Sequence, residues 1–374
     1  MSRGGASGRR RSGTRLRAGR LRVAVPSGRR VRAATPSAQR LWVVVVVLGA
    51  VSALGLSACG TSARSAAGRG PAVRAQAATL VLDFTPNAVH AGIYHALAAG
   101  LYRARGVDLH VEPPGSTTDP LALVASGRAD FGLADGSDVA RAIAAGGDAV
   151  AIMAIAQRPL GGLIALASEH LRSPAALQGR TVGITGVPSD TAVLDTVVSS
   201  AHGDPARLHV RTIGFDGAAA LLAGRLQAFT GFWPADGVAL QVQGHPVTVF
   251  RLDEHGGPAY PGLVLFTTRR TLATRAGLAR ALVAATVRGY EQTLHAPARA
   301  LGDLLRLNPG LAPALTRASL STYLPLFAAR GVPFGTLRPE SVRALSAWMV
   351  AHRLMSRPVS PARYGTDALL PAGG

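Results

Sequence analysis

Residues 79–112 read TLVLDFTPNAVHAGIYHALAAGLYRARGVDLHVE and contain a strand, a helix and a second strand in succession. The apolar run from Thr79 to Phe84 predicts the first strand, and Asp108 to Glu112 predicts the next one. Between them, His90 to Arg105 carries apolar residues at helical spacing and ends before Gly106, where a glycine commonly stops a helix. Such a unit is typical of an α/β protein with a mostly parallel sheet.

The same alternation continues along the chain and predicts two lobes. The first lobe takes further strands at 131–133, 150–156 and 162–166, with helices at 119–126 and 137–145. A new series begins with a strand at 179–184 and a helix at 189–202, and strands at 208–213, 227–231 and 246–250 follow it. A strand at 263–267 then returns to the first lobe, and helical segments continue from Thr274. We therefore assign lobe 1 to 79–168 plus 259–374 and lobe 2 to 169–258.

Two α/β lobes joined by crossing strands are expected to hold a ligand in a cleft at the carboxyl ends of both sheets. Hinge closure over that cleft is the expected motion.

The composition indicates a compact protein, with 48% hydrophobic and 16% charged residues. The formal net charge of +20 is unevenly distributed, because residues 1–58 hold twelve arginines and no Asp or Glu. The remaining residues carry 28 basic and 20 acidic side chains, a net charge of +8. Every basic residue is Arg, and no aromatic residues alternate with the arginines as a stacking surface requires. Nucleic-acid binding is therefore not expected.

An export segment is predicted at the N-terminus. Residues 41–58, LWVVVVVLGAVSALGLSA, form an apolar stretch behind an Arg-rich region without acids, which is typical of a signal peptide. The stretch ends in Leu56-Ser57-Ala58-Cys59-Gly60, which resembles a bacterial lipobox. We expect 1–58 to be the signal peptide, Cys59 to be lipidated, and 59–78 to form a flexible tether. The alternative is an uncleaved transmembrane anchor. Cys59 is the only cysteine, which excludes a disulfide within the chain and a cysteine metal cluster.

Five stretches, in order along the chain, carry a family resemblance: LDFTPNAVHAGIYHALAAGLYRARGVDL (82–109), PPGSTTDPLALVASGRADFGLADGSDV (113–139), AIAQRPLGGLIAL (154–166), GVPSDTAVLDTV (186–197) and GFWPADGVAL (231–240). Over roughly residues 80–292 the chain resembles substrate-binding proteins of bacterial ABC importers for thiamin pyrimidine precursors, which share a fold with fungal pyrimidine synthases (the SsuA/THI5-like family). The resemblance implies a two-lobed, periplasmic-binding-protein-like type II fold with a hinge and an interlobe cleft.

Candidate ligand-binding residues lie within these stretches or near strand ends. Aromatic rings suit stacking on a heteroaromatic ligand, and the carboxylate of Asp236 can accept hydrogen bonds from an aminopyrimidine. Ser116 and Ser189 each stand at a predicted helix start, while Asp119 and Asp190 there disfavour a strongly anionic ligand. For Tyr94 a core role and for His90 a satisfied structural role are the stronger interpretations. The full set is Phe84, Asn87, His90, Tyr94, Ser116, Gln157, Ser189, Trp233, Asp236 and Tyr260.

The resemblance implies capture of an aminopyrimidine outside the cell and delivery to an ABC permease with its ATPase. Phe84 stands where the family commonly has Trp, and Asp236 where it commonly has Glu, so riboflavin, an alkylsulfonate, nitrate or another small molecule stays open as the cargo. A pyrimidine-synthase type of enzyme is disfavoured, because the chain has one cysteine and no HExxH motif. We expect a monomer at the extracytoplasmic face of the cell membrane, with no catalytic residue, cofactor or metal.

Overall fold

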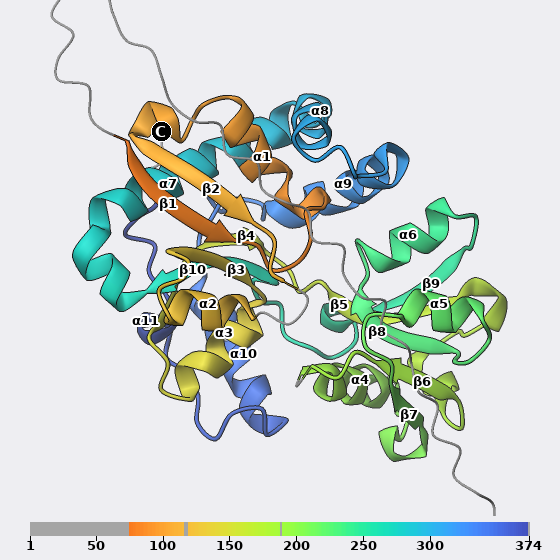
Figure 1. The fold of residues 1–374 in the computed structure, drawn as a ribbon. Helices are drawn as coiled ribbons and strands as arrows, with labels where there is room; N and C mark the ends of the chain where they lie inside the picture. Colours follow the sequence, from red (N-terminus) through yellow and green to blue (C-terminus); the bar gives the residue numbers. More distant parts are fainter. Residues whose placement is uncertain (1–74, 116–118, 188, 373–374) are drawn as a thin grey trace, which may run out of the picture. The chain divides into compact units, whose positions relative to one another are not determined.

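The computed structural model describes residues 75–115, 119–187 and 189–372, which contain two five-stranded sheets (Figure 1). The predicted signal peptide, Cys59 and Ser116 lie outside the described residues, as does the tether up to residue 74. Within the described ranges, no helix combines the length and apolar character that a membrane crossing requires.

The first sheet has the strand order β2-β1-β3-β10-β4. Strands β1, β2 and β3 run parallel, whereas β10 runs antiparallel to both β3 and β4. The sheet is therefore mixed. All of its strands except β10 run in the same direction, in agreement with the mostly parallel sheet that the sequence predicts. Its strands are β1 (Gln76–Val81), β2 (Val107–Glu112), β3 (Phe131–Ala134), β4 (Ala149–Ala156) and β10 (Leu263–Thr268).

Helices cover both faces of the first sheet, because successive side chains of its strands point to opposite faces. Leu80 packs in the cluster that includes α1, α7 and α9 residues, and Val81 packs in the other, with α2, α3 and α10 residues. Figure 1 shows these two groups of helices on either side of the strands. The helices of this lobe are α1 (Ala91–Ala98), α2 (Pro120–Ala125), α3 (Gly136–Ala144), α7 (Arg269–His295), α8 (Pro297–Leu307), α9 (Pro313–Phe327), α10 (Pro339–Ala351) and α11 (Pro361–Tyr364), with short turns η1 (Ala88–His90) and η2 (Arg103–Arg105).

The second sheet has the order β7-β6-β8-β5-β9, with β5 antiparallel to both of its neighbours. Its strands are β5 (Gly161–Leu166), β6 (Thr181–Ile184), β7 (His209–Thr212), β8 (Ala228–Phe232) and β9 (Val247–Arg251). Its helices are α4 (Ser189–Ser200), α5 (Gly217–Leu222) and α6 (Asp236–Val242), with η3 (Ala167–Glu169), η4 (Pro174–Leu177), η5 (Pro205–Arg207) and η6 (Leu252–Glu254).

Two sequence-based boundaries are corrected by the pairing of the strands. The strand predicted at 162–166 is β5, which pairs with β8 and β9, so its assignment to lobe 1 is wrong. Only four residues separate β4 from β5, a spacing at which consecutive strands usually share a sheet; here the chain crosses to the other sheet instead. In addition, β1 begins at Gln76, three residues before the predicted strand and inside the predicted tether.

The predicted helix over 90–105 is shorter than expected. It divides into α1 and the turn η2, with Gly100 at φ +70° between them. A left-handed backbone angle of this kind favours glycine and ends the helix.

The chain crosses between the sheets twice, at 157–160 and at 257–262, and the two crossing segments touch. A Cβ atom added to Gly262 would overlap the backbone carbonyl oxygen of Arg158 and lie 2.9 Å from the Cα atom of Pro159. The backbone N–H of Trp233, at the end of β8, donates to the Leu160 carbonyl oxygen at 3.1 Å. These contacts fix the crossing against the second sheet.

Helix α10 of the first lobe also contacts the second lobe. The indole N–H of Trp348 donates to the Thr196 hydroxyl on α4 at 2.9 Å, and the same hydroxyl lies 3.0 Å from Nε2 of His352. Thr196 and Trp348 are both buried. The lobes are thus joined by α10 as well as by the two crossings.

Replacing Gly262 with Ala is expected to lower the stability of the protein by about 1–3 kcal/mol, because backbone atoms of the facing crossing would have to move. Gly277→Ala is the control, since that position in α7 has open space around it and Ala favours a helix. Thermal unfolding measures both variants. Equal melting temperatures for the two would contradict the close packing of the crossings.

Candidate functional site between the facing sheet edges

Three candidate residues of the first lobe, Phe84, Gln157 and Tyr260, lie at one edge of its sheet together with Asp135. Strands β1, β3 and β4 end at this edge and the antiparallel β10 begins there, which follows from their pairing. Phe84 follows β1, Asp135 follows β3, Gln157 follows β4, and Tyr260 precedes β10. Side chains far apart in the sequence are therefore gathered at the carboxyl ends of parallel strands, where ligands of α/β folds bind.

The second lobe gathers its candidates in the same way. Strands β6 and β8 end at one edge of the sheet, where Ser189 follows β6 and Trp233 and Asp236 follow β8. The antiparallel β5 begins at that edge. Because the 157–160 crossing runs from the end of β4 to the start of β5, the two edges are directly connected.

The loop after β1 presents Phe84 to solvent, with 49% of the residue exposed. Its shape is held by Asn87 and His90. The Asn87 side chain accepts from the Val89 N–H at 2.9 Å and donates to the Thr85 carbonyl oxygen at 3.0 Å. Nδ1 of His90 accepts from the Asn87 N–H at 3.1 Å, which leaves Nε2 to donate to Asp83 at 2.8 Å.

His90 is fully buried and both of its ring nitrogens are occupied within this loop. These two hydrogen bonds agree with a satisfied structural histidine. Asn87 and His90 thus position Phe84, and direct ligand contact by either residue stays a prediction.

Gln157 and Trp233 present unpartnered polar atoms beside the crossing. Both residues are buried, and among the described residues neither Oε1 of Gln157 nor Nε1 of Trp233 has a hydrogen-bond partner. The Gln157 amide nitrogen donates to the Thr336 carbonyl oxygen at 3.2 Å, and the Arg251 guanidinium covers the Trp233 ring at 4.0 Å. A buried polar atom without a partner costs about 1–3 kcal/mol and calls for an explanation.

Asp236 begins α6 and faces back toward β8. One carboxylate oxygen accepts from the Phe232 N–H at 2.8 Å, and burial raises the pKa of this carboxyl, while the hydrogen bond from Phe232 lowers it. The hydrogen bond supports a role in holding the helix start. A contact with a ligand stays a prediction for Asp236.

Tyr260 is buried beside Asp135, a residue that the sequence-based set missed. One Asp135 oxygen accepts from both the backbone N–H and the hydroxyl of Ser137, at 2.8 and 2.7 Å. Burial, with the nearby charge of Asp138, raises the pKa of Asp135 to about 7, against the hydrogen bonds from Ser137 and Tyr260. A signal in the sequence was the position of this acid two residues after the strand-like run at 131–133, within one of the family stretches.

Acidic groups of both lobes lie near each other at these edges. Burial raises the pKa of Asp138 at the start of α3, and the charges of Asp119 and Asp190 raise it further, against the lowering effect of Arg141. Asp119 caps α2 by accepting from the Leu121 N–H at 2.8 Å, and Asp190 accepts from the Thr185 hydroxyl and the Gly186 N–H. Ser189 lies beside Asp190 in the first turn of α4 and is half-buried.

Tyr94 is not brought together with the other candidates. It is a buried residue of α1 that borders a hollow of about 440 Å³ with residues of β2 and α8, and burial raises the pKa of its phenol. The core interpretation fits this position better than the binding one.

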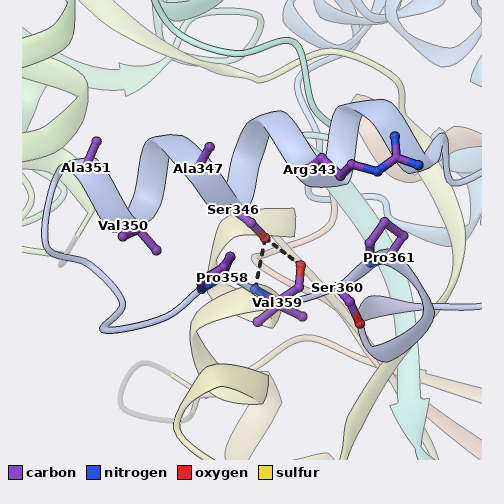
Figure 2. A pocket seen from close by; sticks show the side chains of 9 residues that line it. All are labelled: Arg343, Ser346, Ala347, Val350, Ala351, Pro358, Val359, Ser360 and Pro361. Carbon is purple, nitrogen blue, oxygen red and sulfur yellow. Dashed lines mark hydrogen bonds between the residues drawn. The ribbon is translucent and has the colours of Figure 1, made fainter.

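A second hollow, of about 640 Å³, lies between α10 and the segment 358–361 (Figure 2). There the Ser346 hydroxyl donates to the Val359 carbonyl oxygen at 2.9 Å and so holds the segment against the helix. None of the candidate residues lines this hollow. Across the described ranges, no three His, Cys, Asp or Glu side chains are grouped as a metal site requires.

Asp135→Asn is expected to change the pH dependence of stability. Burial raises the pKa of this carboxyl from 3.8 to about 7 on folding, so the folded state binds the proton more tightly. The free energy of unfolding contributed by this group therefore falls as the pH rises from 4 to 7, by roughly 2–4 kcal/mol. The variant should lose that slope, and chemical unfolding at pH 4 to 8 measures it. Asp108→Asn, on the exposed surface of β2, is the control; the same slope in both variants would argue against an enclosed Asp135.

Relatives of known character share most of the chain. A formylaminopyrimidine-binding protein of Halalkalibacterium halodurans is 31% identical over 75% of this chain and 86% of its own length. A riboflavin-binding protein, RibY, of Chloroflexus aurantiacus is 28% identical over 88% of this chain and 98% of its own length.

Among solved structures, the periplasmic aliphatic sulphonate-binding protein SsuA of Escherichia coli superposes with a TM-score of 0.62 at 16% identity, covering 79% of this chain and 92% of that one. This similarity confirms the periplasmic-binding-protein fold. The family profile described as NMT1/THI5 like matches residues 87–300. Together with the relative that is 31% identical, this match shows that the chain belongs to the NMT1/THI5-like family.

Proposed function

We propose that this protein captures an aminopyrimidine precursor of thiamin between its two lobes and delivers it to an ABC permease with its ATPase. The observation that carries the proposal is the pair of buried, unpartnered polar atoms at the crossing, Oε1 of Gln157 and Nε1 of Trp233. One is an acceptor and the other a donor. The amino group and a ring nitrogen of an aminopyrimidine offer the complementary donor and acceptor.

The chain is a substrate-binding protein and not an enzyme, in line with the 31% identical relative and with the SsuA structure. The ligand's flat ring would stack on Phe84, whose loop is held rigidly by Asn87 and His90. Binding of this kind relieves the cost of two buried polar atoms, and a ligand without matching groups would leave that cost in place.

The charges at the sheet edges favour an aminopyrimidine over an anion. The charges of Asp119 and Asp190 each raise the pKa of Asp138, so further negative charge around Asp138 is disfavoured. A sulfonate or a nitrate ion would need positive partners there. These negative charges disfavour an alkylsulfonate or nitrate as the ligand, although the fold is shared with a sulphonate-binding protein.

Riboflavin is the second candidate ligand, because the riboflavin-binding relative RibY aligns with this chain over 98% of RibY's own length. Riboflavin is also flat and carries acceptors and a donor on its ring. It is a larger ring system, so its affinity relative to the aminopyrimidine tests the size of the site.

The proposed location rests on the export segment. Cleavage before Cys59 and lipidation of its thiol would hold the protein at the outer face of the cell membrane as a monomer beside the permease. The SsuA structure, a periplasmic protein, supports a location outside the cytoplasm.

Calorimetry on the full chain is expected to detect binding of formylaminopyrimidine and weaker or no binding of an alkylsulfonate. Gln157→Met should weaken the affinity about tenfold or more, because it removes the acceptor at similar volume. Gln241→Met, on the exposed side of α6, should leave the affinity unchanged. If the protein bound riboflavin but gave no heat with any aminopyrimidine, the aminopyrimidine assignment would be wrong and riboflavin would be the ligand.

Cys59→Ala is expected to release the protein from the membrane fraction or to leave it unprocessed, with ligand affinity unchanged. Cell fractionation and calorimetry measure the two effects separately. Loss of affinity in this variant would contradict the separation of the anchor from the binding site.

A further inference from the structure

Two exposed phenylalanine rings, one from each lobe, are in contact. Phe84 follows β1 of the first sheet and Phe215 follows β7 of the second, with 49% and 77% of each residue exposed. Their ring centroids lie 5.8 Å apart with the ring planes at 42°. A single exposed hydrophobic residue needs no explanation, but two that meet across a pair of lobes do.

The loops on both sides are built to present these rings. The Phe84 loop is held by the hydrogen bonds of Asn87 and His90. On the other side, the Ile213 N–H donates to the Ile184 carbonyl oxygen at 2.9 Å, and Gly214 then adopts φ +61°, a left-handed angle that favours glycine. The chain thus turns away from the sheet edge at Gly214 and leaves the Phe215 side chain outside its own lobe.

We propose that Phe215 and Phe84 form an aromatic clasp that closes the two lobes over a bound planar ligand, so that Phe215 is a further residue that sets ligand affinity. This inference rests on the proposed function for its ligand. A flat ring held between two parallel rings needs a centroid separation of about 7 Å. At 5.8 Å the two rings contact each other and leave no room for a ligand ring between them, so the stacking on Phe84 proposed above would use the ring face turned away from Phe215.

The clasp would stabilise the closed arrangement of the lobes and would therefore slow dissociation of the ligand. An aromatic pair of this geometry favours the closed arrangement, and removing one ring is expected to raise the dissociation rate about three- to tenfold. The association rate should change less, because it is set by diffusion into the open form.

A first experiment needs no ligand. Spin labels at Ala99→Cys on the first lobe and Ala223→Cys on the second, in the full chain with Cys59→Ala, report the distance between the lobes; both positions are exposed. Phe215→Ala should shift the distances toward longer values or broaden them. Leu222→Ala, an exposed apolar residue at the end of α5, is the matched control and should not. An unchanged distribution in Phe215→Ala would overturn the clasp.

A second experiment measures dissociation of formylaminopyrimidine by stopped-flow fluorescence for Phe84→Ala, Phe215→Ala, the double variant and Phe215→Tyr. Coupled, non-additive effects of the two single changes, with rates restored by Tyr, support the clasp. Additive effects, or a Phe215→Ala rate equal to that of Leu222→Ala, would reject it. If no aminopyrimidine binds any variant but Phe215→Ala still alters the lobe distance, the ligand assignment fails and the clasp stands.

Discussion

The close approach of the two crossing segments is the constraint on which the rest of the structure depends. Since backbone atoms of Arg158 and Pro159 lie directly against Gly262, the chain passes between the sheets as one narrow, paired connection. Each crossing starts or ends at a sheet edge that carries candidate residues. Gln157 is the first residue of the 157–160 crossing, and the Trp233 N–H donates to the Leu160 carbonyl oxygen at its other end.

Much of the architecture could be predicted from local patterns. The buried runs of β1, β3, β4 and β10 and the helix start capped by Asp119 follow from apolar periodicity and capping residues. The position of β5 could not, because a strand buried on both faces has the same sequence pattern in either sheet. Only its partners β8 and β9, more than sixty residues further along, decide where it pairs.

The site was predictable to the extent that strand ends mark it. Phe84, Gln157, Trp233 and Tyr260 lie at the expected edges, and their roles as ligand contacts stay predictions. Tyr94 lies away from this edge, within helix α1. The apolar spacing of α1 predicts that Tyr94 is buried, but it does not show whether the side chain faces the core or the ligand site. The sequence did not identify Asp135, because its raised pKa results from burial in the folded protein. It did not identify Phe215 either, because that ring is in contact with Phe84 of the other lobe, which no local sequence pattern encodes.

The contact of α10 with α4 changes what an affinity measurement on this protein reports. Trp348 and His352 both approach the Thr196 hydroxyl, so any opening of the lobes that separates these helices must exchange buried hydrogen bonds for water. The observed dissociation constant is then the intrinsic one divided by the fraction of molecules in the binding-competent arrangement. Substitutions in α10, which carries none of the candidate residues, would thereby change the ligand concentration at which the protein is half saturated.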